Sequence, residues 1–290
     1  MTLHGPVLVG TDLSPASGEA LRQGARLATE LETTLFVCHV VPELIPDGSV
    51  FAEFRRANLN VADSVVATAR AAVEQQVHAV LGANAAVEVT LEWGTPHVGL
   101  LRQADEKGAG VVVAAPGSVA LDVVRHASTP VLIARPSPKG PVVGATDFSD
   151  PSLPALRTAA AEARRRGSIL HLLHAFDVGV FTLGQAPLAA MPYLAGGTAI
   201  ALEGLDNLRT VARQRLDGML RDVDLPGEAA VIAGFARDVI VEYAESINAE
   251  LVVIGTHGRS GLARLTLGST AASVVESAPC SVLVVRLMHR

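Results

Sequence analysis

Short apolar runs and helical stretches alternate along the whole chain. The runs are rich in Val, Leu and Ile without polar alternation, which is typical of parallel strands buried on both faces. Strands are expected near 6–10, 34–41, 86–92, 110–115 and 130–134, and again near 141–145, 168–175, 228–233, 250–255 and 281–286. Helices are expected near 15–31, 53–82, 96–108 and 117–127, and again near 151–166, 201–221, 236–248 and 268–277. This alternation predicts an α/β protein in which helices cover both faces of parallel sheets.

The second half of the chain repeats the first. The sequence VLVGTDLS at 7–14 returns as VVGATDFS at 142–149, so that Asp12 matches Asp147 at an offset of 147 − 12 = 135. Such a repeat predicts a tandem duplication with domains 1–137 and 141–290, joined by a linker rich in Pro and Gly. Ligands of such sheets bind beyond the carboxyl ends of the strands.

A glycine-rich stretch follows the fourth expected strand of the second half. Its spacing is Gly255-x2-Gly258-x9-Gly268-Ser269, and it leads directly into the last expected helix. Glycines allow backbone N–H groups to approach an anion closely, and a helix N-terminus favours negative charge. Ser269 or Thr270 can cap the helix and offer a hydroxyl to the same anion. The pattern suits a phosphate-binding loop, and a turn that merely caps the helix is the alternative.

This loop lacks the lysine of a Walker A motif, since Lys107 and Lys139 are the only lysines of the chain. It resembles the ATP-binding signature of the universal stress protein family, Gly-x2-Gly-x9-Gly-Ser/Thr. The flanking residues 255–259 and 278–285 resemble that family as well. The resemblance covers nearly the whole chain. It implies two flavodoxin-like, Rossmann-like domains, each a five-stranded parallel sheet of order 3-2-1-4-5.

The resemblance also implies the residues of an ATP site in the second domain. The residues so implied are Gly144, Ala145, Thr146, Asp147, Ala175, Ile254, Gly255, Gly258, Arg259, Gly268, Ser269 and Thr270. From chemistry alone, Asp147 would hydrogen-bond an adenosine group or hold Mg²⁺, or would only form an Asx-turn. Resemblance to the family favours the adenosine role. The backbone near Ala175 is expected to contact adenine, and Arg259 either faces phosphate or is a solvated loop charge.

The first half departs from the family pattern. Val111–Ala114 matches Leu251–Ile254 at an offset of 140, whereas the residues from Val123 onward match those from Val274 onward at an offset of 151. The connection between them is therefore 151 − 140 = 11 residues shorter in the first half. Only Ala115-Pro116-Gly117-Ser118 joins strand to helix, and Pro116 has no backbone N–H to donate. Asp12 remains, but the phosphate-binding loop is missing. We therefore expect one ATP per chain, held by the second domain.

The composition argues against a nucleic-acid-binding protein and against a disulfide. The 290 residues carry a net charge of −6, and only 3% of them are aromatic, which argues against a nucleic-acid partner. Cys38 and Cys280 stand in different halves within or beside apolar runs, and are expected to be buried, reduced thiols of a cytoplasmic protein without a metal site.

The segment Val178–Leu202 contains no charged residue and is long enough to span a bilayer. Its several glycines and prolines would leave backbone groups unsatisfied in lipid, so membrane insertion is disfavoured. An apolar flap or a subunit contact is the expected role.

The resemblance thus implies a stress-response protein that binds ATP, with Mg²⁺ as a candidate companion ion, as a regulatory or sensing ligand. It supplies no general base with an oriented nucleophile, which disfavours a dedicated enzyme. A slow ATPase or phosphotransferase using Asp147 and Arg259, and a scaffold that has lost its ligand, are the alternatives. In the family's strand order the apolar final strands, Val131–Ala134 and Val282–Val285, lie at sheet edges, and the two halves are expected to pair through them within one chain. Whole chains are expected to form a homodimer.

Overall fold

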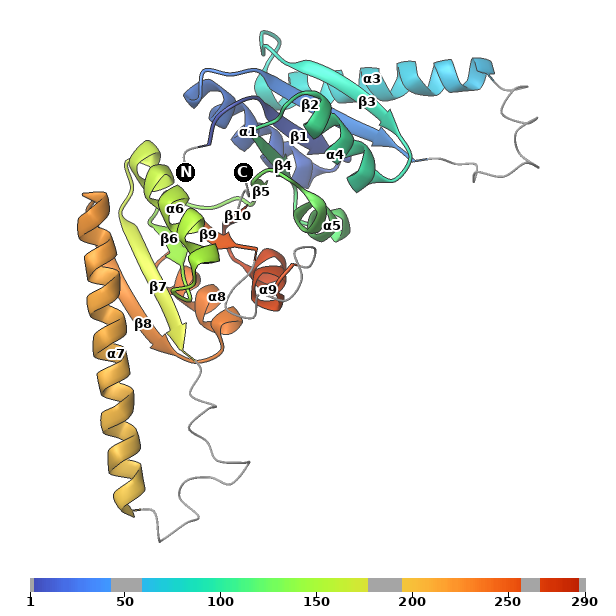
Figure 1. Ribbon diagram of the computed structural model, residues 1–290. Helices are drawn as coiled ribbons and strands as arrows, with labels where there is room; N and C mark the ends of the chain where they lie inside the picture. Colours follow the sequence, from blue (N-terminus) through green and yellow to red (C-terminus); the bar gives the residue numbers. More distant parts are fainter. Residues whose placement is uncertain (1–2, 43–58, 177–194, 257–266, 287–290) are drawn as a thin grey trace, which may run out of the picture. The chain divides into compact units, whose positions relative to one another are not determined.

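The computed structural model describes residues 3–42, 59–176, 195–256 and 267–286 (Figure 1). The chain divides into two compact units, Leu3–Pro136 and Ser137–Arg290.

The first unit alternates strands and helices from its start. Its elements are β1 (Val7–Thr11), α1 (Pro15–Glu30), β2 (Leu35–Val41), α3 (Leu59–Leu81), β3 (Glu88–Trp93), α4 (Pro96–Glu106), β4 (Val111–Ala114), α5 (Ser118–His126) and β5 (Val131–Ile133). The strands are parallel and lie in the order β3-β2-β1-β4-β5.

The second unit repeats this plan. Its elements are β6 (Val142–Ala145), the 3₁₀ turn η2 (Asp150–Ser152), α6 (Leu153–Arg166), β7 (Leu170–Phe176), α7 (Ala195–Val223), β8 (Gly227–Ala233), α8 (Ala236–Ser246), β9 (Leu251–Gly255), α9 (Ser269–Ser277) and β10 (Ser281–Val285). Its parallel strands lie in the order β8-β7-β6-β9-β10. Both units therefore have the expected order 3-2-1-4-5, and the predicted fold class is confirmed.

Right-handed crossovers place the helices of each unit on opposite faces of its sheet. The chain moves in one direction from β6 to β8 and then returns to β9, so that α6 and α7 cover one face while α8 and α9 cover the other. Strand order reverses between β6 and β9, where the carboxyl ends of neighbouring strands leave room for a ligand. The first unit has the same switch between β1 and β4.

The core of the second unit consists of strands that are buried on both faces. Every residue of β6, β9 and β10 is buried, as the unbroken apolar runs predict. Val142 pairs with Leu251 in the parallel register of β6 and β9. Burial of each such Leu or Val contributes about 1.5–3 kcal/mol relative to exposure. The turns that follow β6 and β9 therefore start from well-packed strands.

Some element bounds differ from those expected. The helix expected from 201 to 221 is longer and begins at Ala195, and the helix expected near 151 is preceded by the short turn η2. Gly167 ends α6 with φ 62°, the left-handed conformation that glycine adopts without strain. The first part of the helix expected from 53 to 82 lies outside the described residues, as does most of the uncharged segment Val178–Leu202.

The structure also bears on the two cysteines and on membrane-spanning helices. Cys38 and Cys280 are both buried, as predicted. Within the residues that the structure describes, no helix has the length and apolar character needed to cross a membrane.

Candidate functional site

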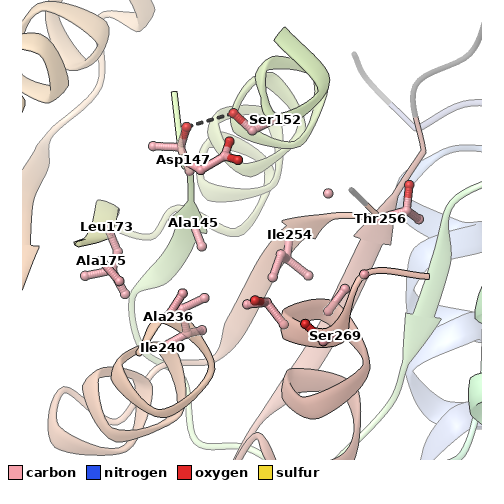
Figure 2. Close-up of a pocket in the computed structure, with 15 residues that line it drawn as sticks. Ala145, Asp147, Ser152, Leu173, Ala175, Ala236, Ile240, Ile254, Thr256 and Ser269 are labelled. Atoms are coloured by element: carbon pink, nitrogen blue, oxygen red, sulfur yellow. Dashed lines mark hydrogen bonds between the residues drawn. The ribbon is translucent and has the colours of Figure 1, made fainter. Parts of the chain in front are cut away.

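A cavity of about 320 Å³ lies at the carboxyl edge of the second unit's sheet, at the switch between β6 and β9. Figure 2 shows it between the end of β6, the start of α8 and the start of α9. The lining residues are Ala145, Thr146, Asp147, Ser152, Leu173, Ala175, Ala236, Ile240, Ile254, Gly255, Thr256, Gly268, Ser269, Thr270 and Ala271.

The turn after β6 fixes Asp147 at the cavity wall. Its Oδ1 accepts hydrogen bonds from the backbone N–H of Ser149 at 3.0 Å and from the Ser149 hydroxyl at 2.5 Å. The Oγ1 of Thr146 accepts from the N–H of Phe148 at 2.9 Å and lies 2.8 Å from the hydroxyl of Ser152 (Figure 2). Phe148 has φ 63°, a left-handed conformation that is uncommon for a bulky residue. Asp147 thus forms an Asx-turn and lines the cavity as well.

The start of α9 forms a second wall. Gly268 occupies the N-cap position with φ −61° and ψ 146°, and its N–H donates to the carbonyl oxygen of Thr256 at 2.9 Å. Ser269, Thr270 and Ala271 form the first turn and line the cavity. The first N–H groups of a helix have no partner within the helix, and its dipole adds partial positive charge there. This wall therefore suits an anionic group.

The expected capping by a hydroxyl is wrong. No side chain of α9 makes a cap hydrogen bond, and the helix begins at Ser269 rather than being capped by it. The reason is geometric: the N-cap residue has extended backbone and lies before the first turn, and here that residue is Gly268. A glycine at the N-cap leaves space above the first turn of the helix.

The remaining lining is apolar. Leu173 and Ala175 come from β7, Ala236 and Ile240 from α8, and Ile254 from the end of β9. Figure 2 shows Leu173, Ala175, Ala236 and Ile240 gathered on one side of the cavity. An apolar wall of this kind suits a flat heteroaromatic ring, while the carboxylate and the helix start suit polar groups of the same ligand.

Two stretches of the chain, residues 4–135 and 140–286, match the universal stress protein family. The chain belongs to this family. Universal stress protein Rv1996 of Mycobacterium tuberculosis is 32% identical to it over 311 aligned residues, which cover 97% of this chain and 95% of that protein. Universal stress protein MJ0531 of Methanocaldococcus jannaschii is 31% identical over 145 residues, 50% of this chain and 81% of that protein.

Solved structures of universal stress proteins share the fold. One from Archaeoglobus fulgidus has a TM-score of 0.64 at 20% identity, and the match covers 97% of this chain and 98% of that one. A putative universal stress protein from Pseudomonas aeruginosa has a TM-score of 0.62 at 18% identity, with 98% and 93% covered.

In this universal stress protein, most of the residues predicted for the ATP site lie around one cavity. Those that line it are Ala145, Thr146, Asp147, Ala175, Ile254, Gly255, Gly268, Ser269 and Thr270. Gly258 and Arg259 lie outside the described residues.

Gly144 does not line the cavity. A Cβ at this position would lie 3.0 Å from the Cβ of Ala159 and 3.2 Å from Cδ2 of Leu156, both in α6. Successive residues of a strand point to opposite faces, so Ala145 faces the cavity while Gly144 faces the helix. The glycine allows close packing of α6 on β6.

Several lining residues were not predicted. Ser152 and Thr256 are polar, whereas Leu173, Ala236, Ile240 and Ala271 are apolar or small. The β-strand period offers a signal for Leu173, which lies two residues before Ala175 on the same face. Thr256 directly follows the predicted Gly255. Ala236 and Ile240 follow β8, whose carboxyl end also lies at this edge.

The donor set indicates how Mg²⁺ would be held. Mg²⁺ usually takes one or two protein carboxylates together with phosphate oxygens. Asp147 is the one carboxylate among the described lining residues, and within the described chain no group of three or more His, Cys, Asp or Glu could hold a metal. This arrangement fits an ion that arrives with a triphosphate better than an ion resident in the protein.

Proposed function

We propose that this universal stress protein binds ATP in its second unit, Ser137–Arg290, as a regulatory or sensing ligand in the cytoplasm. One observation carries the proposal: a carboxylate on a fixed turn, an apolar wall and the start of a helix line the same cavity. These are the three surfaces that ribose, adenine and phosphate require.

The adenine ring is proposed to lie on the apolar wall, against Ala175, Ile240 and Ile254. The backbone of β7 near Ala175 offers hydrogen-bonding groups at the strand end. Asp147 is proposed to accept hydrogen bonds from the ribose hydroxyls, as carboxylates do at other nucleotide sites of this sheet type.

The triphosphate is proposed to extend toward the start of α9. Backbone N–H groups at Ser269 and Thr270, together with the helix dipole, supply donors and partial positive charge. Gly255 and Gly268 keep side chains away from the path of the phosphates. Gly258 and Arg259 remain proposed ligands of the phosphates. Mg²⁺ would be held mainly by phosphate oxygens, with Asp147 as the carboxylate of the described lining, and would offset part of the triphosphate's charge.

The proposed role is binding rather than dedicated catalysis. Oδ1 of Asp147 is already held by the N–H and the hydroxyl of Ser149, which positions it as a hydrogen-bond acceptor within a turn. Among the described lining residues, no nucleophile stands beside an oriented general base. Whole chains are proposed to associate as a homodimer.

Mass spectrometry of the nucleotide released from the denatured, purified protein tests this proposal. The expected result is bound ATP, with calorimetric titration of the emptied protein giving saturable ATP binding. Release of ADP from protein that was loaded with ATP would favour the slow ATPase instead. An empty protein that shows no calorimetric binding would contradict the proposal and favour a scaffold.

A further inference from the structure

The first unit contains a cavity of its own at the matching sheet edge, with a volume of about 350 Å³. This volume is similar to the 320 Å³ of the second unit's cavity, although the connection between β4 and α5 is much shorter than that between β9 and α9. Shortening of the loop has therefore not closed the cavity. The lining residues are Gly10, Thr11, Asp12, Ser17, Cys38, His39, Val40, Pro42, Pro96, Leu100, Ala114, Ala115, Pro116, Gly117, Ser118, Val119 and Ala120.

The acidic turn of the first unit is built like that of the second. Oδ1 of Asp12 accepts from the N–H of Ser14 at 3.0 Å, and Oγ1 of Thr11 accepts from the N–H of Leu13 at 3.0 Å. Leu13 has φ 66°, close to the value of its counterpart Phe148. The turn that presents the carboxylate has therefore been kept in both copies.

The apolar wall is also kept. Val40 and Leu100 occupy the positions of Ala175 and Ile240, and Cys38 that of Leu173. Val40, Leu100 and Cys38 are buried, with 9%, 4% and 1% of their surface exposed. Burial raises the pKa of the Cys38 thiol to about 11, so that it stays protonated as part of this wall.

The side that would receive phosphates differs. Ala115 and Pro116 replace the glycine-rich loop, and Pro116 has no N–H to donate. As in the second unit, the described lining contains one carboxylate, here Asp12, and no Lys or Arg; the start of α5 at Ser118 remains, but the N–H groups of the longer loop are lost. The lining therefore offers an acceptor for hydroxyl groups and little compensation for a triphosphate's charge.

We propose that the first unit is a second ligand site, selective for an uncharged nucleoside over its phosphorylated forms. The ring would lie on the wall formed by Val40, Leu100 and Cys38, and the ribose hydroxyls would donate to Asp12. The cavity, the Asp12 carboxylate and the apolar wall are observed in the first unit and do not depend on the second. The choice of a nucleoside as the ligand class rests on the ATP function proposed for the second unit.

Cys38 supplies a site-resolved test, because a ligand on the wall shields its thiol. The intact protein is treated with a small neutral thiol reagent near pH 9, and peptide mass spectrometry follows Cys38, with Cys280 of the other unit as the internal control. Since the thiolate is the reactive form, modification without ligand is slow and measurable. With ATP present throughout to fill the second unit, adenosine is expected to slow modification of Cys38 at least about tenfold at saturation.

Two ligand changes and one matched pair of variants sharpen the test. We expect ATP alone to leave the Cys38 rate unchanged, and 2′,3′-dideoxyadenosine to protect at least about tenfold more weakly than adenosine because it lacks the donors to Asp12. Asp12→Asn should lose the protection, whereas Asp147→Asn should keep it. Absence of adenosine protection, or equal protection by ATP or by the dideoxy compound, would overturn the inference. Calorimetric ATP binding in the same sample shows separately whether the proposed function holds.

Discussion

The backbone N–H of Gly268 donates to the carbonyl oxygen of Thr256 at 2.9 Å, which ties the start of α9 to the end of β9. Thr256 in turn donates its N–H to the carbonyl oxygen of Val285 in the neighbouring strand β10 at 3.1 Å. Both ends of the glycine-rich stretch are therefore anchored to the sheet. The first turn of α9 has a fixed position at the cavity before any ligand binds.

Gly268→Ala is expected to lower ATP affinity at least about tenfold, or ~1.4 kcal/mol, with little loss of stability. The φ of −61° suits alanine, so the cost arises from a methyl group above the first turn of the helix rather than from backbone strain. Calorimetric titration measures the affinity. Gly218→Ala, within α7 and away from the cavity, is the matched control and should bind ATP like the wild type. Equal affinities for all three proteins would remove Gly268 from the site.

Asp147→Asn is expected to weaken ATP binding by about tenfold, because one carboxylate oxygen becomes a donor that cannot accept from a ribose hydroxyl. Asparagine can keep the turn, since its Oδ1 can still accept from Ser149. Asp150→Asn, an exposed neighbour, controls for the loss of one negative charge. Titration of both variants under one ionic strength decides the matter: if both lose affinity equally, the effect is general electrostatics and not a contact of Asp147.

Substitutions at two neighbouring positions of β6, Gly144 and Ala145, are expected to have different effects: the first on stability and the second on ATP affinity. Gly144→Val should reduce the free energy of unfolding by about 1–3 kcal/mol, because the new side chain meets Ala159 and Leu156. Ala145→Val should instead reduce ATP affinity, because Ala145 lines the cavity. Urea unfolding and titration measure the two quantities. The opposite pattern, lost affinity in a stable Gly144→Val protein, would restore Gly144 to the site.

The strands, the repeat and the position of the glycine-rich loop could be predicted from local sequence patterns, whereas the sheet order and most of the site residues were implied by the resemblance to the family. Apolar runs define buried strands wherever they occur, and the spacing of Gly255 and Gly268 brings known chemistry to a strand end. The open cavity of the first unit could not be predicted, since its wall joins Val40 and Leu100, which are far apart in the sequence.

The ion pairs of Arg166 with Glu162 and Glu250 also could not be predicted from local sequence patterns. The run Arg164–Arg166 suggests solvated charges at a helix end, stabilised only by the helix dipole. In the structure, Arg166 forms ion pairs with Glu162 of its own helix and with Glu250, which follows 84 residues later, and these side chains are 10%, 5% and 8% exposed. The partner Glu250 also accepts from the N–H of Gly140, so the cluster holds the linker to the second unit. A distant partner leaves no local signal in the sequence.

The free energy of unfolding is expected to decrease at acidic pH, because protonation of His171 favours the unfolded state. Burial lowers the pKa of His171 below its ordinary value of 6.5, although Glu228 on β8 partly opposes this. The folded protein thus favours the neutral ring, whose Nδ1 lies 2.8 Å from the hydroxyl of Tyr243. This contribution is present in full above the ordinary value and is lost as pH falls through it toward the lower pKa of the folded state.

Urea unfolding at a series of pH values from about 8 to about 5 measures this dependence. His171→Gln should flatten the loss of stability between these limits, whereas His78→Gln, at an exposed position of α3, should leave it unchanged. A wild-type slope that persists in His171→Gln would assign the acid sensitivity to another group.

One chain of this protein is expected to hold one ATP, in the second unit. The second unit combines the glycine-rich loop with the start of α9, whereas in the first unit Pro116 and the shortened connection remove the donors that phosphates need. Equilibrium dialysis of the intact protein at saturating ATP tests this most directly. At ATP about tenfold above the wild-type Kd, we expect a value close to one ATP per chain, which falls to about one tenth if Gly268→Ala and Asp147→Asn, each about tenfold weaker, are combined. A value close to two, or no binding by the wild type, would contradict it.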